Sequence, residues 1–144
     1  MNRIEAVLVS DESVAGPYLS MAVDGVPIDK LLGESADGLV SSLLGWFHNE
    51  ADGQIPWDRI LPPLGCTSYA PILICPDDLD LKCSVVVAEV VAEHESIRWD
   101  KLGFDATAKG AVGSVVRWEP GWGGYRFSRD AYEACLAAFR SAAT

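Results

Sequence analysis

The segment SVVVAEVVAE, residues 84–93, constrains the fold more than any other part of the chain. Its β-branched residues pack well on a pleated surface, and the run predicts a strand. Two similar segments flank it: APILIC (70–75), an apolar run, and SIRWDKLGF (96–104), in which Ile97 and Trp99 alternate with polar residues. Residues 93–96 then form a hairpin connection, so we expect a sheet at the centre of the fold.

Four further segments predict strands: IEAVLVS (4–10), YLSMAV (18–23), SVVRWE (114–119) and YRF (125–127). Asp24-Gly25 predicts a two-residue hairpin after residues 18–23, and the return strand should be short because Pro27 lacks an N–H donor. The segments 114–119 and 125–127 are expected to pair around the loop PGWGG.

Two helices are expected. Ser35 can cap a helix of about a dozen residues, in which apolar residues recur at helical spacing: Leu39, Val40, Leu43, Leu44 and Phe47. Ser128 can cap the second helix, with its apolar stripe on Tyr132, Cys135, Leu136 and Phe139. Between them, glycines and prolines predict a surface connection with one helical turn at WDRIL (57–61).

No βαβ alternation, repeat or linker appears. We therefore predict an α+β fold, a single domain over residues 1–144, with a largely antiparallel five- or six-stranded sheet packed by two main helices. The hydrophobic fraction, 49%, suits a packed core of this size.

The charge is uneven along the chain. Residues 1–80 hold 13 acids and three bases, whereas residues 81–144 hold eight of each, so the net charge of −10 belongs to the first 80 residues. Such a chain is a poor partner for nucleic acid or an anionic membrane, and it favours a basic protein partner. The alternative is that the acidic surface has no binding role and serves only to keep the protein soluble.

The N-terminus MNRIEAVLVSDES has no convincing signal-peptide pattern, and no apolar run reaches the length of a membrane span. The four cysteines are then expected to be free thiols in a reducing cytoplasm.

The segment ICPDDLDLKC (74–83) is the strongest candidate site, because two cysteines bracket three aspartates there. One alternative is a metal- or ligand-binding domain built from Cys66, Cys75 and Cys83 with Asp77, Asp78 and Asp80. The cysteine gaps of eight and seven residues differ from the tight pairs of structural zinc sites. An acidic turn, with thiols facing inward and carboxylates facing water, explains the segment more simply, so no metal and no cofactor is expected.

No catalytic motif is present, and His48 and His94 belong to no recognised catalytic pattern, so we expect no enzyme activity. Acidic residues with interspersed tryptophans favour an interaction surface, because charge steers a partner and large rings anchor it. The expected partner-binding residues are Glu50, Asp52, Trp57, Asp77, Asp78, Asp80 and Trp122.

The run YAPILICPDDLDLKCSVVVAEV, with VDGVPID before it and YRFSRDAYEACLAAF at the end, resembles small acidic bacterial proteins without known enzymatic activity. In size and charge such chains are similar to immunity proteins of polymorphic and contact-delivered toxin systems. The resemblance implies a cytoplasmic protein that binds and blocks a cognate toxin. Asp77, Asp78 and Asp80 would then pair with basic groups that the toxin uses on its own substrate.

Overall fold

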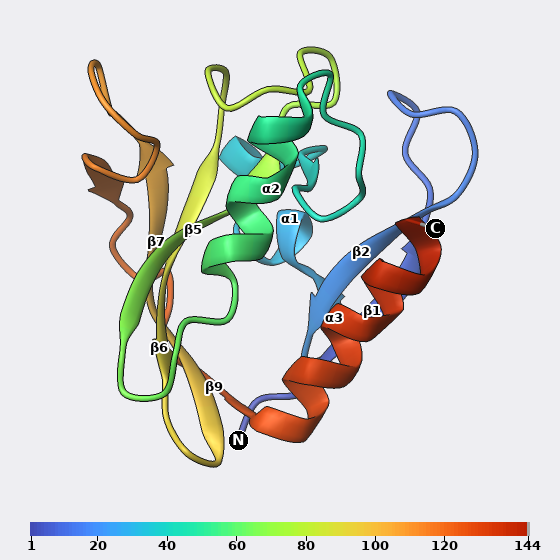
Figure 1. Cartoon of the computed structure of the whole chain (residues 1–144). Helices are drawn as coiled ribbons and strands as arrows, with labels where there is room; N and C mark the ends of the chain where they lie inside the picture. Colours follow the sequence, from blue (N-terminus) through green and yellow to red (C-terminus); the bar gives the residue numbers. More distant parts are fainter. Residues whose placement is uncertain (144) are drawn as a thin grey trace.

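The strands form two antiparallel sheets in the computed structural model, which describes residues 1–143 (Figure 1). The larger sheet has the order β4-β5-β6-β7-β8, with β9 also paired to β7, and the smaller has the order β1-β2-β3. The small sheet comprises β1 (Ile4–Val9), β2 (Tyr18–Val23) and β3 (Val26–Pro27). The large sheet comprises β4 (Val40–Ser41), β5 (Thr67–Ile74), β6 (Val86–Ala92), β7 (Ser96–Asp105), β8 (Val116–Trp118) and β9 (Tyr125–Ser128).

The helices are α1 (Ile28–Leu31), α2 (Glu50–Arg59) and α3 (Arg129–Ala143), with a 3₁₀ turn η1 at Glu34–Ala36. Figure 1 shows the large sheet on one side, α2 beside β5, and α3 lying along the small sheet. The predicted α+β class and the six-stranded antiparallel sheet are confirmed. Within residues 1–143 no helix combines the length and apolar character needed to cross a bilayer.

The central strand β6 explains the long apolar segment noted in the sequence. Val86 and Val90 belong to the main core, which lies between the two sheets and α3. Val85 and Val87 point the other way and join a second apolar cluster with Ile74. Because both faces of the strand are covered along most of its length, it needs no polar alternation.

The Asp24-Gly25 hairpin is confirmed. Asp24 has a φ of 52° and Gly25 a φ of 84°, the left-handed pair that a type I′ turn requires. The Asp24 carboxylate also accepts hydrogen bonds from the Arg3 amide and the Asn2 side chain, both at 2.7 Å. The return strand β3 ends at Pro27, as expected from the missing N–H.

The expected pairing between residues 114–119 and 125–127 is wrong. β8 and β9 both pair with β7, at Gly103–Asp105 and Ser96–Trp99 respectively. The connecting loop runs along β7, and a Cβ on Gly123 would lie 2.5 Å from the Asp100 carbonyl oxygen. A glycine at that position lets the loop approach β7 closely, so the two short strands follow one another along the same edge.

The helix predicted after Ser35 is also wrong. The chain forms the turn η1, then β4, in which Val40 and Ser41 pair with Ile74 and Leu73. Gly38 and Gly45 have φ values of 84° and 78°, which an α-helix cannot accommodate. Of the apolar residues at helical spacing, Leu39, Val40 and Leu43 are buried through turns and sheet pairing, whereas Leu44 and Phe47 are half-buried.

A helix occupies instead the segment expected to be a surface connection. The Asn49 side chain caps α2, accepting from the amides of Ala51 at 2.8 Å and Asp52 at 3.4 Å. Both Gly53 and Pro56 lie inside this helix. The helix covers the open edge of β5, where Arg59 donates to the Tyr69 carbonyl at 3.1 Å.

The C-terminal helix agrees with the sequence. The Ser128 hydroxyl accepts a hydrogen bond from the Ala131 amide at 3.2 Å and so caps α3. The predicted stripe is buried in the main core: Tyr132, Cys135, Leu136 and Phe139. Trp99 is fully buried, and Trp118 is half-buried against the second cluster.

Candidate functional site

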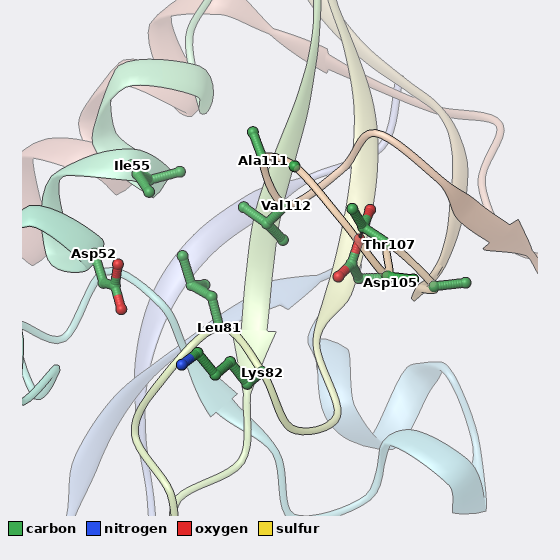
Figure 2. A pocket seen from close by; sticks show the side chains of 11 residues that line it. Asp52, Ile55, Leu81, Lys82, Asp105, Thr107, Ala111 and Val112 are labelled. Carbon is green, nitrogen blue, oxygen red and sulfur yellow. Dashed lines mark hydrogen bonds between the residues drawn. The ribbon is translucent and has the colours of Figure 1, made fainter.

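Two connecting segments and the first turn of α2 gather at one end of the large sheet. Strands β5 and β7 run in the same direction, so the connections that follow them, 75–85 and 106–115, start from the same end of the sheet. The N-terminal turn of α2 lies beside them (Figure 1). Together they line a hollow of about 470 Å³ (Figure 2).

The walls of the hollow come from distant parts of the sequence. Asp52 and Ile55 of α2 face Leu81 and Lys82 across it, with Val112 on the third side (Figure 2). The sequence shows no signal for this arrangement, because the segments meet only through the strand order and the position of α2. Lys82 is the one cation among the residues that line the hollow.

The wall formed by residues 106–115 is held by hydrogen bonds. The Asp105 carboxylate accepts from the Thr107 hydroxyl at 2.7 Å and from the Gly113 amide at 3.0 Å. The Arg59 guanidinium donates to the Val112 carbonyl and so joins this loop to α2. The loop is therefore fixed at both ends.

The acidic segment after β5 consists of two successive turns. The Leu79 amide donates to the Cys75 carbonyl at 3.0 Å, which closes the first turn. Leu79 has a φ of 50°, and the chain reverses there. The Asp80 carboxylate then accepts from the amides of Lys82 at 2.9 Å and Cys83 at 3.3 Å. The turn interpretation of this segment is thereby supported, with Asp80 as its organiser.

The two turns bring two thiols and one carboxylate together. The Sγ atoms of Cys75 and Cys83 and a carboxylate oxygen of Asp78 lie within 4.8 Å of one another. The pKa of the Cys83 thiol is raised, first because it hydrogen-bonds with the Asp78 carboxylate, an interaction that favours the protonated thiol. The cluster joins three of the residues that the sequence proposed as metal ligands.

The expectation that the two thiols of the acidic segment face inward is wrong for Cys83, which is exposed, whereas Cys75 is half-buried. Of the other two cysteines, Cys66 is exposed and Cys135 is buried in α3. Cys66 precedes β5 at the opposite end of that strand from Cys75, so it cannot join the other two. The carboxylates of Asp77 and Asp78 are exposed, as predicted.

The acidic end of the molecule carries five carboxylates expected to bind a partner: Glu50, Asp52, Asp77, Asp78 and Asp80. Within residues 1–143 none of the five takes part in an ion pair. Several of the cations are paired elsewhere: Lys30 with Asp11, Asp29 and Asp37, and Arg98 with Glu93 and Asp100. The negative charge of the acidic end is therefore uncompensated by salt bridges.

The two tryptophans expected to anchor a partner lie elsewhere. The ring of Trp57 is half-buried on α2, with the Arg140 guanidinium 4.2 Å from its centroid. Trp122 is half-buried against Phe104, at 5.6 Å between ring centroids. Both rings are engaged within the chain and neither lines the hollow, and their role in partner binding stays a prediction.

The histidines lie far apart. His48 is exposed in the loop before α2, and His94 is exposed in the β6–β7 hairpin at the other end of the sheet. The aspartates of the acidic segment are exposed or half-buried.

Comparison with family models, with curated proteins and with solved structures finds no match to this chain.

Proposed function

We propose that this chain is a non-enzymatic binding protein that captures a basic protein partner through its acidic end. In this proposal it is a cytoplasmic, immunity-type inhibitor that neutralises a cognate bacterial toxin by stoichiometric binding. The observation that carries the proposal is the set of five carboxylates at one end of the molecule that lack ion-pair partners within residues 1–143.

Unpaired carboxylates on neighbouring loops produce a local negative potential. Such a potential attracts a basic surface over about 10 Å at moderate ionic strength and speeds the encounter. Apolar side chains beside the charges supply contact area once the partner has docked. Ile55, Leu81 and Val112 line the hollow next to Asp52 and are suited to this role.

Affinity capture with the tagged chain as bait identifies the partner. The proposal requires a basic protein that binds in a one-to-one ratio and arrests growth when it is expressed alone. Co-expression of this chain must then restore growth. Recovery of a partner that is not toxic, or of a toxin that this chain leaves active, contradicts the immunity function.

Charge-neutralised variants test the acidic end. The triple variant Glu50→Gln/Asp52→Asn/Asp77→Asn is expected to lose capture and growth protection, because it removes three of the unpaired carboxylates. Asp78 and Asp80 remain unchanged, since Asp78 lies beside the thiols and Asp80 holds the turn.

The matched control is Glu5→Gln/Glu12→Gln/Glu95→Gln, which removes the same charge from exposed sites outside the acidic end. It should capture the partner as the unmodified chain does. Equal binding by both triple variants would sink the proposal that the acidic end is the binding surface.

A further inference from the structure

The thiol–carboxylate cluster formed by Cys75, Asp78 and Cys83 has a donor set suited to a transition-metal ion. Two cysteines offer soft thiolates and an aspartate offers an oxygen, a combination that zinc accepts and that calcium and magnesium do not favour. The three donor atoms lie within 4.8 Å of one another.

That spacing is close to what tetrahedral zinc needs. Bonds of about 2.3 Å to sulfur place two thiolate ligands about 3.8 Å apart. Donor atoms already within 4.8 Å therefore reach bonding positions through small movements of the three side chains. A disulfide is the competing outcome, but it requires the two sulfurs to approach to about 2.05 Å.

The backbone holds these donors in place without a metal. Cys75 directly follows β5, and the hydrogen bond from the Leu79 amide to its carbonyl brings Asp78 beside it. The Asp80 carboxylate, which accepts from the Cys83 amide at 3.3 Å, returns Cys83 to the same place. Leu79 and Leu81 pack against the second apolar cluster and anchor the loop.

The surroundings leave room for a fourth ligand. Asp78 and Cys83 are exposed, and Cys83 also lines a hollow of about 490 Å³ that includes Ser84. Three protein ligands with an open fourth position are the arrangement of zinc sites that keep a water or an exogenous ligand.

We propose that Cys75, Asp78 and Cys83 bind one zinc ion per chain, with the fourth coordination position open to solvent. The site uses Asp78 but not the adjacent Asp77. Of the four cysteines it uses Cys75 and Cys83, and it excludes Cys66. It does not rest on the partner-binding function, because the isolated chain supplies all three protein ligands.

The full chain, kept reduced and stripped of metal by a chelator, is titrated with Zn²⁺ in competition with a chromophoric chelator. Saturation at about one zinc per chain is expected. Co²⁺ used as a spectroscopic probe should give thiolate-to-cobalt charge-transfer absorption, which reports sulfur ligation directly.

Paired variants locate the site. Cys83→Ser should weaken zinc binding at least about 100-fold, and Asp78→Asn at least about 10-fold. Mutating a residue that only hydrogen-bonds to a metal ligand typically lowers metal affinity about 10–100-fold, and losing a ligand itself should lower it no less. Cys66→Ser and Asp77→Asn, which change an exposed cysteine and an exposed aspartate outside the cluster, should bind as the unmodified chain does. Circular dichroism confirms that each variant is folded.

Three results overturn the proposal. The first is the lack of saturable zinc binding by the reduced chain. The second is binding that survives Cys83→Ser but is lost in Cys66→Ser. The third is a cobalt complex without charge-transfer absorption, because sulfur ligation is then excluded. If the reduced chain binds no zinc and oxidation links Cys75 to Cys83, the cluster is a disulfide pair.

Discussion

The hydroxyl of Tyr132 on α3 donates a hydrogen bond to the main-chain carbonyl of Ile60, just after α2, at 2.6 Å. The same hydroxyl accepts a hydrogen bond from the indole N–H of Trp99 on β7 at 3.1 Å. One buried side chain thus joins both long helices to the large sheet. The join fixes the end of α2, whose other end forms one wall of the hollow.

Replacing that hydroxyl should destabilise the fold. Tyr132→Phe leaves the buried Ile60 carbonyl and Trp99 indole without this partner, so we expect the free energy of unfolding to fall by about 1–3 kcal/mol. Urea denaturation measures the change. The control Tyr69→Phe alters an exposed tyrosine and should change stability by no more than about 0.5 kcal/mol. Equal stability of Tyr132→Phe and the unmodified chain would show that the bridge contributes nothing.

Two glycine substitutions should have opposite effects. A Cβ on Gly103 would lie 2.2 Å from the Arg117 carbonyl oxygen, so Gly103→Ala must push β7 and β8 apart and should cost about 1–3 kcal/mol. A Cβ on Gly53 in α2 meets nothing closer than 3.7 Å, and Gly53→Ala should stabilise the helix by about 0.5–1 kcal/mol. Thermal unfolding of both variants checks the pair. A stabilising Gly103→Ala would contradict the close approach of the strands.

Burial of Cys135 makes stability depend on pH in the alkaline range. Burial is the main cause that raises the pKa of its thiol from 9.0 to about 12, with the Glu5 carboxylate adding to the shift. The folded state therefore keeps the proton longer than the unfolded state. The contribution of the protonated thiol to the free energy of unfolding is therefore fully present below pH 9 and is lost as the pH rises from 9 to 12.

Cys135→Ala removes this pH dependence. The stability advantage of the unmodified chain over the variant should shrink by about 1.4 kcal/mol for each pH unit above 9. Urea unfolding between pH 8 and 10.5 provides the comparison, with Cys66→Ala as an exposed control that keeps the full dependence. A constant difference between Cys135→Ala and the unmodified chain across this range would mean that the thiol titrates alike in both states.

The sheet could be predicted because its signals are local. Alternating or continuous apolar runs define β1, β2, β5, β6 and β7, and Asp24-Gly25 has the two positive φ values that its turn type needs. The capping serine and the buried stripe of α3 are local in the same way.

The helix predicted after Ser35 is absent because apolar spacing alone does not determine the backbone conformation of the glycines within it. Gly38 and Gly45 interrupt any helix there, and the sheet edge beside Ile74 takes up Val40. At α2 the reverse holds, because glycines and prolines such as Pro56 predict a surface connection where the chain forms a helix. That helix tolerates the proline, and Asn49 followed by two acidic residues was a capping signal in the sequence.

The candidate site could be predicted only in part. The acidic segment 74–83 is a continuous stretch, so its turn and its exposed carboxylates were visible in the sequence. Its convergence with Asp52 and with the loop 106–115 depends on tertiary structure, as does the separation of Cys66 from the other thiols.

We propose that the unpaired carboxylates of the acidic end steer a basic partner toward this chain. The most direct measurement is the association rate constant of this chain with the captured partner, determined by stopped flow at low and high salt. We predict that the rate falls steeply with salt. Glu50→Gln/Asp52→Asn/Asp77→Asn should slow association at least about tenfold at low salt, with a smaller effect on dissociation. An unchanged rate for this variant, or the same loss in Glu5→Gln/Glu12→Gln/Glu95→Gln, would contradict the claim.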